Sequence, residues 1–123
     1  MQLTEHRPGD YHVVRQIKTD FIQIDQEHYT SSLILGARLL EADWPVQKYE
    51  DLDEAAIEPL LIHQPEVVLL GHGIQQSFPP LDIQRTFLKA GVGIECMTLD
   101  AAARTFNVLM SENRRALAGF ILP

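Results

Sequence analysis

The sequence predicts one α/β domain, a compact three-layer arrangement in which N-terminal antiparallel β-hairpins join a C-terminal strand–helix–strand–helix–strand unit with a mixed sheet. After residue 65, apolar strands alternate with helical patterns, an order typical of crossover helices that cover a sheet. Before it, three short β-branched or aromatic stretches are separated by polar turns; they lie at 12–17, 21–24 and 32–35. The 123 residues fit a single core, with 1–10 as a loosely ordered arm and 11–123 as the domain.

The first helix and the strand after it have clear signals. Apolar residues after Asp53 are spaced for one helix face, and Asp53 can cap that helix. Pro59 indicates either a late start, with Pro59 in the first turn, or a kink. The apolar run within 66–70 is typical of a strand buried on both faces, and it ends at the glycine loop Gly71-His72-Gly73.

Proline and glycine mark the bounds of the next elements. Pro79-Pro80 indicates the start of a helix over 81–90, and Gly91 suits its left-handed C-cap. The remaining pattern predicts a strand, a helix and a final strand, at 92–98, 100–112 and 115–122.

Composition excludes several classes of function. The net charge is −7, with 10 basic against 17 acidic residues, which argues against a nucleic-acid partner. Apolar runs are far shorter than the roughly 20 residues of a membrane span, and no secretory leader is visible. Cys96 is the single cysteine, and the histidines lack metal-ligand spacing. We therefore expect a cytoplasmic protein with neither metal nor cofactor.

The glycine loop supports two readings. Its backbone can approach a ligand outside the carboxyl end of a strand, with His72 placed for proton transfer. Alternatively, Gly71 and Gly73 only permit a tight exit from the sheet. The full dinucleotide and Walker spacings are absent, and no nucleophile accompanies His72. Cys96, within an alternating strand, reads as a small buried hydrophobe.

The helix expected over 100–112 carries the second group of candidates. Thr98 or Asp100 can cap it, and Asp100 and Arg104 are spaced as a surface ion pair. Asn107 is a poor helix former, so its place in the middle of a helix indicates a specific role for its side chain. Either Arg104 and Asn107 bond to neighbouring loops and fix the helix on the sheet, or Arg104 and the glycine loop receive an anionic group or a partner's carboxylate.

Three further residues have a structural and a functional reading. Arg114 and Arg115 complement the dipole at the helix end, although a doubled arginine before an apolar strand is also typical of an exposed point at which a partner protein docks. Trp44 is a core residue or an interface anchor, and the core is favoured.

The stretch from Gly91 to Pro123 resembles the closing signature of the domain-of-unknown-function 498 family, whose relatives include a mitochondrial respiratory complex I assembly factor and an adipogenesis-associated protein. The matching positions are Met97, Thr98, Ala102, Ala103, Arg104, Thr105, Asn107, Val108, Leu109, Glu112, Arg114 and Arg115. Phe106 stands where the family usually has Tyr, and His72 replaces a Thr in its Pro-Glu-strand-Gly-Thr-Gly element. The early hairpin around 21–35 is also similar.

The resemblance implies an α/β domain whose glycine loop and Arg-containing helix meet near a surface cleft, and it implies no established reaction. It favours a non-catalytic assembly factor with protein partners, such as respiratory-complex intermediates; a homodimer stays open. The alternative is a small protein or enzyme that binds an anionic ligand at Gly71–Gly73 with Arg104. The candidate binding residues are Gly71, His72, Gly73, Thr98, Arg104, Asn107, Glu112, Arg114 and Arg115.

Overall fold

The computed structural model describes residues 10–123, so the predicted arm lies outside the described residues except for Asp10. In chain order the elements are β1 (Val14–Ile17), β2 (Ile22–Ile24), β3 (Glu27–Tyr29), β4 (Leu33–Leu35), β5 (Leu40–Glu41), the 3₁₀ turn η1 (Tyr49–Asp51), α1 (Glu54–Leu61), β6 (Val67–His72), α2 (Leu81–Ala90), β7 (Gly93–Met97), α3 (Leu99–Ser111) and β8 (Ala116–Ile121).

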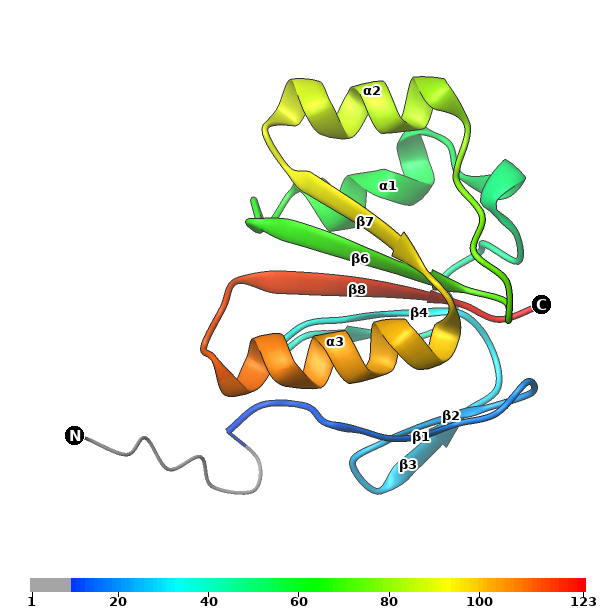
Figure 1. The fold of residues 1–123 in the computed structure, drawn as a ribbon, viewed down its shortest axis with the longest axis vertical. Helices are drawn as coiled ribbons and strands as arrows, with labels where there is room; N and C mark the ends of the chain where they lie inside the picture. The colour runs from blue at the N-terminus through cyan, green and yellow to red at the C-terminus, as the bar shows by residue number, and fades with distance from the viewer. Residues whose placement is uncertain (1–9) are drawn as a thin grey trace.

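Two sheets and three helices form three layers, as the sequence predicts (Figure 1). The central five-stranded sheet has the order β5-β4-β8-β6-β7; β6 is parallel to β7 and β8, and β4 is antiparallel to β8 and β5. On one face it packs against α1 and α2. On the other it packs against α3 and the antiparallel sheet β1-β2-β3.

The strand β4 departs from the expected run of hairpins. It leaves the three-stranded sheet and pairs with β8, with Leu33 opposite Phe120. Its three residues, Leu-Ile-Leu, are all buried, and only the central sheet covers both faces of a strand. The pattern missed β3 and β5, which are short and carry exposed residues.

The helix bounds follow their caps. The Asp53 carboxylate accepts a hydrogen bond from the Ala56 N–H at 2.8 Å, which confirms the predicted N-cap. Because α1 begins at Glu54, Pro59 lies beyond its first turn, and the late-start prediction is wrong. Gly91 ends α2 with φ 73°, as expected for a left-handed C-cap. Thr98 caps α3 through the Ala101 N–H.

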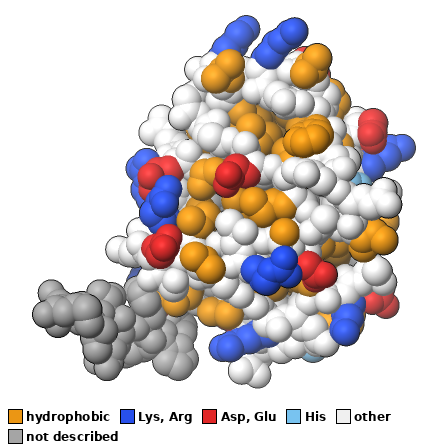
Figure 2. Space-filling view, viewed as in Figure 1, with side chains coloured by type: hydrophobic (Ala, Val, Ile, Leu, Met, Phe, Trp, Pro, Cys, Tyr) orange, Lys and Arg blue, Asp and Glu red, His pale blue; other side chains and the backbone are white. Residues whose placement is uncertain are grey.

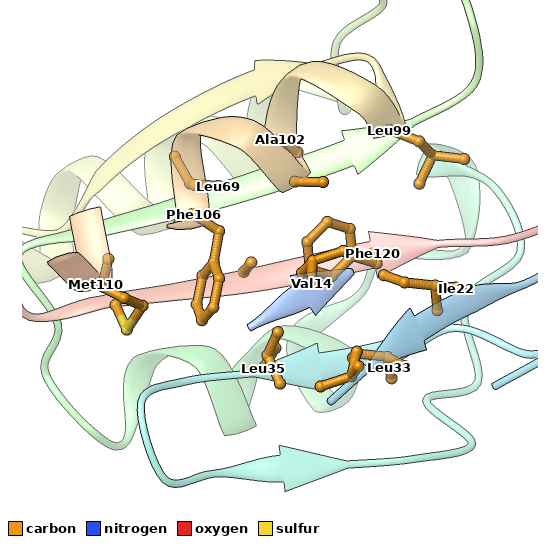
Figure 3. Packing of buried hydrophobic residues seen from close by; sticks show 14 of the residues in the cluster. Val14, Ile22, Leu33, Leu35, Leu69, Leu99, Ala102, Phe106, Met110 and Phe120 are labelled. Atoms are coloured by element: carbon orange, nitrogen blue, oxygen red, sulfur yellow. The ribbon is translucent and has the colours of Figure 1, made fainter. Parts of the chain in front are cut away.

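Small residues let α3 lie directly on β6. A Cβ atom added at Gly71 would lie only 2.7 Å from the Cβ atom of Ala102, which is fully buried. The larger side chains of the same core, including Phe106, Phe120 and Leu69, fill the space around this contact (Figure 3). Gly71 is therefore covered by the helix.

On the opposite face, β8 receives the only tryptophan of the sequence. A Cβ atom at Gly119 would lie 2.8 Å from Cζ3 of Trp44. The indole is 6% exposed, and its N–H donates to the Ala56 carbonyl at 2.9 Å. The prediction that Trp44 belongs to the core is confirmed.

The strand β7 forms an open edge of the central sheet. Gly93 donates its N–H to Glu66 next to β6, so the backbone groups of Ile94 and Cys96 point away from the sheet. Gln76, in the segment between β6 and α2, donates from Nε2 to the Cys96 carbonyl at 3.2 Å. One outward carbonyl of this edge is thus satisfied by the chain itself.

We predict that Gly71→Ala lowers the free energy of unfolding by about 1–3 kcal/mol, because the new methyl group overlaps Ala102. Denaturant unfolding measures the loss. In the double variant with Ala102→Gly the loss should be smaller than the sum of the single losses, since the two methyl groups no longer compete. Strict additivity would contradict the contact.

Candidate functional site

The structure distributes the predicted site residues along the whole length of α3 and β6. The predicted end of the strand at residue 70 is wrong, because Gly71 and His72 pair with β8 and are the last two residues of β6. Gly73 follows β6, and its carbonyl accepts from the Leu99 N–H at 3.1 Å, so the glycine loop as predicted and Thr98 lie at the carboxyl end of β6 and the start of α3. Arg104 and Asn107 lie in the middle of α3. Glu112, Arg114 and Arg115 follow the end of α3, at the opposite end of β6.

His72 and Arg104 lie on opposite faces of the central sheet. Alternation along β6 directs Gly71 toward α3 and His72 toward the core beneath α1 and α2. The His72 ring meets the Tyr49 ring edge-on with centroids 5.1 Å apart, and its Nδ1 lies 3.3 Å from the Ile121 carbonyl oxygen. The structure therefore does not bring His72 and Arg104 to one crevice.

Asn107 joins α3 to the edge strand β1. Its Oδ1 accepts from the Val14 N–H at 3.0 Å, and its Nδ2 donates to the Val14 carbonyl at 2.9 Å. One side-chain amide thus satisfies both backbone groups of a strand residue, as a neighbouring strand would. For Asn107 these bonds agree with the structural alternative, in which the side chain fixes the helix, except that it bonds to a strand and not to a loop.

The arginines after α3 contact the start of β6. Arg114 Nε lies 3.7 Å from Glu66 Oε1, and the Arg115 N–H donates to the same oxygen at 3.2 Å. These partly exposed contacts link the turn after α3 to the sheet. They lie away from the glycine loop because the six residues of β6 separate the two places.

Two neighbouring hollows lie between α3 and the β1–β2 hairpin, and together we call them the α3–hairpin groove. Its larger hollow has a volume of about 560 Å³ and its smaller one about 170 Å³. The two adjoin, since Ile17 and Asp100 line both. The larger hollow is lined by Ile17, Lys18, Thr19, Asp20, Phe21, Gly73, Ile74, Thr98, Leu99 and Asp100. The smaller is lined by Val14, Arg15, Gln16, Ile17, Asp100, Ala103, Arg104 and Asn107.

Three exposed basic residues, Arg15, Lys18 and Arg104, line this groove. Figure 2 shows Lys and Arg side chains over the lower part of the molecule, where α3 and the hairpin lie in Figure 1. Among residues 10–123 none of the three forms an ion pair; the predicted pair of Asp100 with Arg104 does not form.

Arg15, Lys18 and the apolar residues of the groove were not predicted from the sequence. One signal was available: Arg15 and Gln16 are consecutive polar residues within an alternating strand. In the structure the register of β1 shifts between Val14 and Gln16, so that both Arg15 and Gln16 are exposed. A bulge of this kind directs an extra side chain outward.

A second cluster of titratable groups lies on the other side of the sheet. Tyr49, 3% exposed, directs its hydroxyl to the Leu70 carbonyl at 3.4 Å and also contacts the Cys96 thiol. Burial raises the pKa of the Cys96 thiol above its ordinary value of 9.0, and the hydrogen bond to Tyr49 opposes this rise. Burial, together with Cys96, raises the pKa of Tyr49 above 10.0. The thiol therefore stays protonated at neutral pH and is a poor nucleophile.

We predict that Asn107→Ala lowers the free energy of unfolding by about 1–3 kcal/mol, because Val14 loses both of its hydrogen-bond partners. Denaturant unfolding measures this, and amide exchange at Val14 should become faster. Arg104→Ala, one turn away and exposed, is the matched control and should change stability by less than about 0.5 kcal/mol. Equal losses in both variants would contradict the role of Asn107.

We predict that the free energy of unfolding falls as pH rises above about 9. The unfolded chain releases the Cys96 and Tyr49 protons near their ordinary pKa values of 9.0 and 10.0, whereas the folded chain holds them to higher pH. Urea unfolding between neutrality and alkaline pH measures the slope. Cys96→Ala should reduce the slope, and an unchanged slope would show that other groups cause it.

Comparisons with known proteins agree with this geometry. The NMR structure of a Xanthomonas campestris protein is similar to the chain, with a TM-score of 0.83 and 36% identity, over 95% of this chain and 89% of that one. The chain is 34% identical to the "13 kDa major membrane protein" of Francisella tularensis over 87 residues, 70% of this chain and 71% of that protein. No helix of the described residues is long and apolar enough to cross a membrane.

A more distant relative is the Drosophila melanogaster "NADH dehydrogenase [ubiquinone] 1 alpha subcomplex assembly factor 3". The identity is 27% over 84 residues, which are 65% of this chain but only 43% of the Drosophila protein. The model of the family described as "Protein of unknown function (DUF498/DUF598)" matches residues 14–121, which include every element from β1 to β8. The chain belongs to the DUF498/DUF598 family.

Proposed function

We propose that this protein is a non-catalytic interaction protein that takes part in assembling a larger protein complex, and that a partner binds in the α3–hairpin groove. The observation that carries the proposal is the row of Arg15, Lys18 and Arg104 beside apolar side chains of the groove. Exposed arginines next to an apolar depression are typical of protein interfaces, in which Arg is enriched.

One distant relative supports an assembly role. The name of the Drosophila relative describes an assembly factor for an NADH dehydrogenase, so a respiratory complex is the first assembly to test. The cluster of Tyr49, Cys96 and His72 offers little support for catalysis, because its thiol has a raised pKa and its tyrosine is buried.

A second candidate is a protein that binds a small anionic ligand. The larger hollow, at about 560 Å³, falls within the size range of ligand pockets, and it lies at the carboxyl end of β6. Gly73 and Thr98 line it, while Arg104 lines the adjoining hollow. A ligand that raises the melting temperature of the wild type but not of Arg104→Ala would favour this candidate over the first.

We predict that affinity purification of the natively expressed protein enriches one protein complex, and that Arg104→Ala reduces the affinity for that complex by up to about fivefold, because an exposed ion pair contributes up to about 1 kcal/mol. Quantitative mass spectrometry measures the recovery. Arg85→Ala, on the exposed face of α2, is the matched control and should retain the complex.

Two outcomes would contradict the proposal. One is full recovery of the complex with a stably folded Arg104→Ala protein, which would remove the groove from the interface. The other is equal loss with Arg85→Ala, which would indicate an effect of overall charge. In either case the proposed contact with the groove fails.

A further inference from the structure

We infer that the α3–hairpin groove receives an extended acidic segment of a partner protein, in which an apolar side chain follows the carboxylates. This inference rests on the proposed function and specifies the chemistry of its partner. It depends on three features of the described residues: the local charge, the order of polar and apolar side chains, and the rigidity of the groove.

The charged side chains that line the two hollows are three basic and two acidic, whereas acidic residues prevail in the whole chain. The sequence has a net charge of −7, yet Arg15, Lys18 and Arg104 lie in two adjoining hollows and form no ion pair among the described residues. Surface carboxylates are plentiful enough to neutralise such groups, so their unpaired state favours an external carboxylate. A carboxylate bound between two arginines would gain hydrogen bonds from both guanidinium groups.

The order of side chains along the groove specifies the segment. Arg15 from β1 and Arg104 from α3 line the smaller hollow. Ile17 then leads into the larger hollow, where Phe21, Ile74 and Leu99 supply an apolar surface beside Lys18. Ile74 is 83% exposed, so this surface has much area to bury against an occupant. A peptide segment with carboxylates at one end and an apolar side chain at the other matches this order of side chains along the groove.

Two aspartates argue against a continuous polyanion. Asp20 lines the larger hollow and Asp100 lines both hollows, and both side chains are exposed. A nucleic acid or an anionic membrane would bring negative charge onto them as well as onto the basic residues, against the charge of −7. A peptide carries separate charges, so its carboxylates can contact the arginines while its apolar part lies beside the aspartates.

The groove is held in shape before a partner arrives. Asn107 fixes Val14, the residue before Arg15, to α3 through two hydrogen bonds. The bulge after Val14 then places Arg15 beside the same hollow as Arg104. The backbone positions that carry these two basic residues are thus held relative to each other, which lowers the entropy cost of ordering the groove on binding.

Fluorescence anisotropy with short labelled peptides tests the inference on the intact chain. The probe carries two glutamates followed by leucine and phenylalanine; its counterparts carry glutamines or lysines in place of the glutamates. We expect the acidic peptide to bind best and to weaken as salt rises. Arg15→Gln and Arg104→Gln should each reduce affinity roughly fivefold, whereas Arg85→Gln, with the same charge change on α2, should stay within about twofold.

Several results would overturn the inference. Equal binding of the glutamine peptide would show that charge is not recognised, and equal affinity of the two arginine variants and the wild type would move the site elsewhere. Inorganic phosphate or phosphatidylserine vesicles that compete as well as the peptide, with the same loss in Arg104→Gln, would assign the groove to a small anion or a membrane instead.

The same data separate this inference from the assembly role. If the recovered complex is lost with Arg104→Ala but the acidic peptide does not displace it from the wild type, the inference of an acidic segment is overturned and the assembly role is supported. Tight binding of the acidic peptide without any recovered complex would overturn the assembly role and support the inference that the groove receives an acidic segment.

Discussion

The fold depends on β8, the one strand with which both halves of the chain pair. Its neighbours are β4 from the N-terminal half and β6 from the C-terminal half. All six residues of β8 are buried, and Gly119 leaves room for the Trp44 ring on one face while Phe120 contacts the core beneath α3 on the other. A strand covered on both faces must be nearly all apolar, and it gains burial from two cores at once.

Much of the fold could be predicted because its signals are local. Asp53, Thr98 and Gly91 mark helix ends through hydrogen bonds or backbone angles that involve only neighbouring residues. The partner of β4 could not be read in the same way. Three buried residues show that a strand is covered, but which strand lies beside it depends on residues about 85 positions away. Pro59 left two alternatives open, of which the late start is wrong because α1 already begins at Glu54, after the Asp53 cap.

Only part of the candidate site could be predicted, because only part of it depends on residues that are close in the sequence. Asn107 drew attention because it is a poor helix former, and its two bonds to Val14 supply the physical explanation. The opposite orientations of Gly71 and His72 could not be predicted because the strand was expected to end at residue 70; β6 continues to His72, and consecutive residues of a regular strand face opposite layers. The groove itself was hidden, because β1 and α3 are distant in sequence and meet only through tertiary packing. Arg15 and Lys18 belong to no sequence motif, and only the contact between β1 and α3 shows that they line a groove.

The open edge of β7 has a consequence for how copies of this chain behave at high concentration. An unpaired strand edge invites pairing with another copy, and such pairing is a common start of aggregation. Here the Cys96 carbonyl is already occupied by Gln76, and Glu95 is exposed on the same strand. A second copy pairing antiparallel about Glu95 would set two carboxylates directly opposite each other, which is unfavourable. Antiparallel pairing of two β7 edges about Glu95 is thus disfavoured by groups on the surface, and the domain gives up none of its buried apolar surface for this protection.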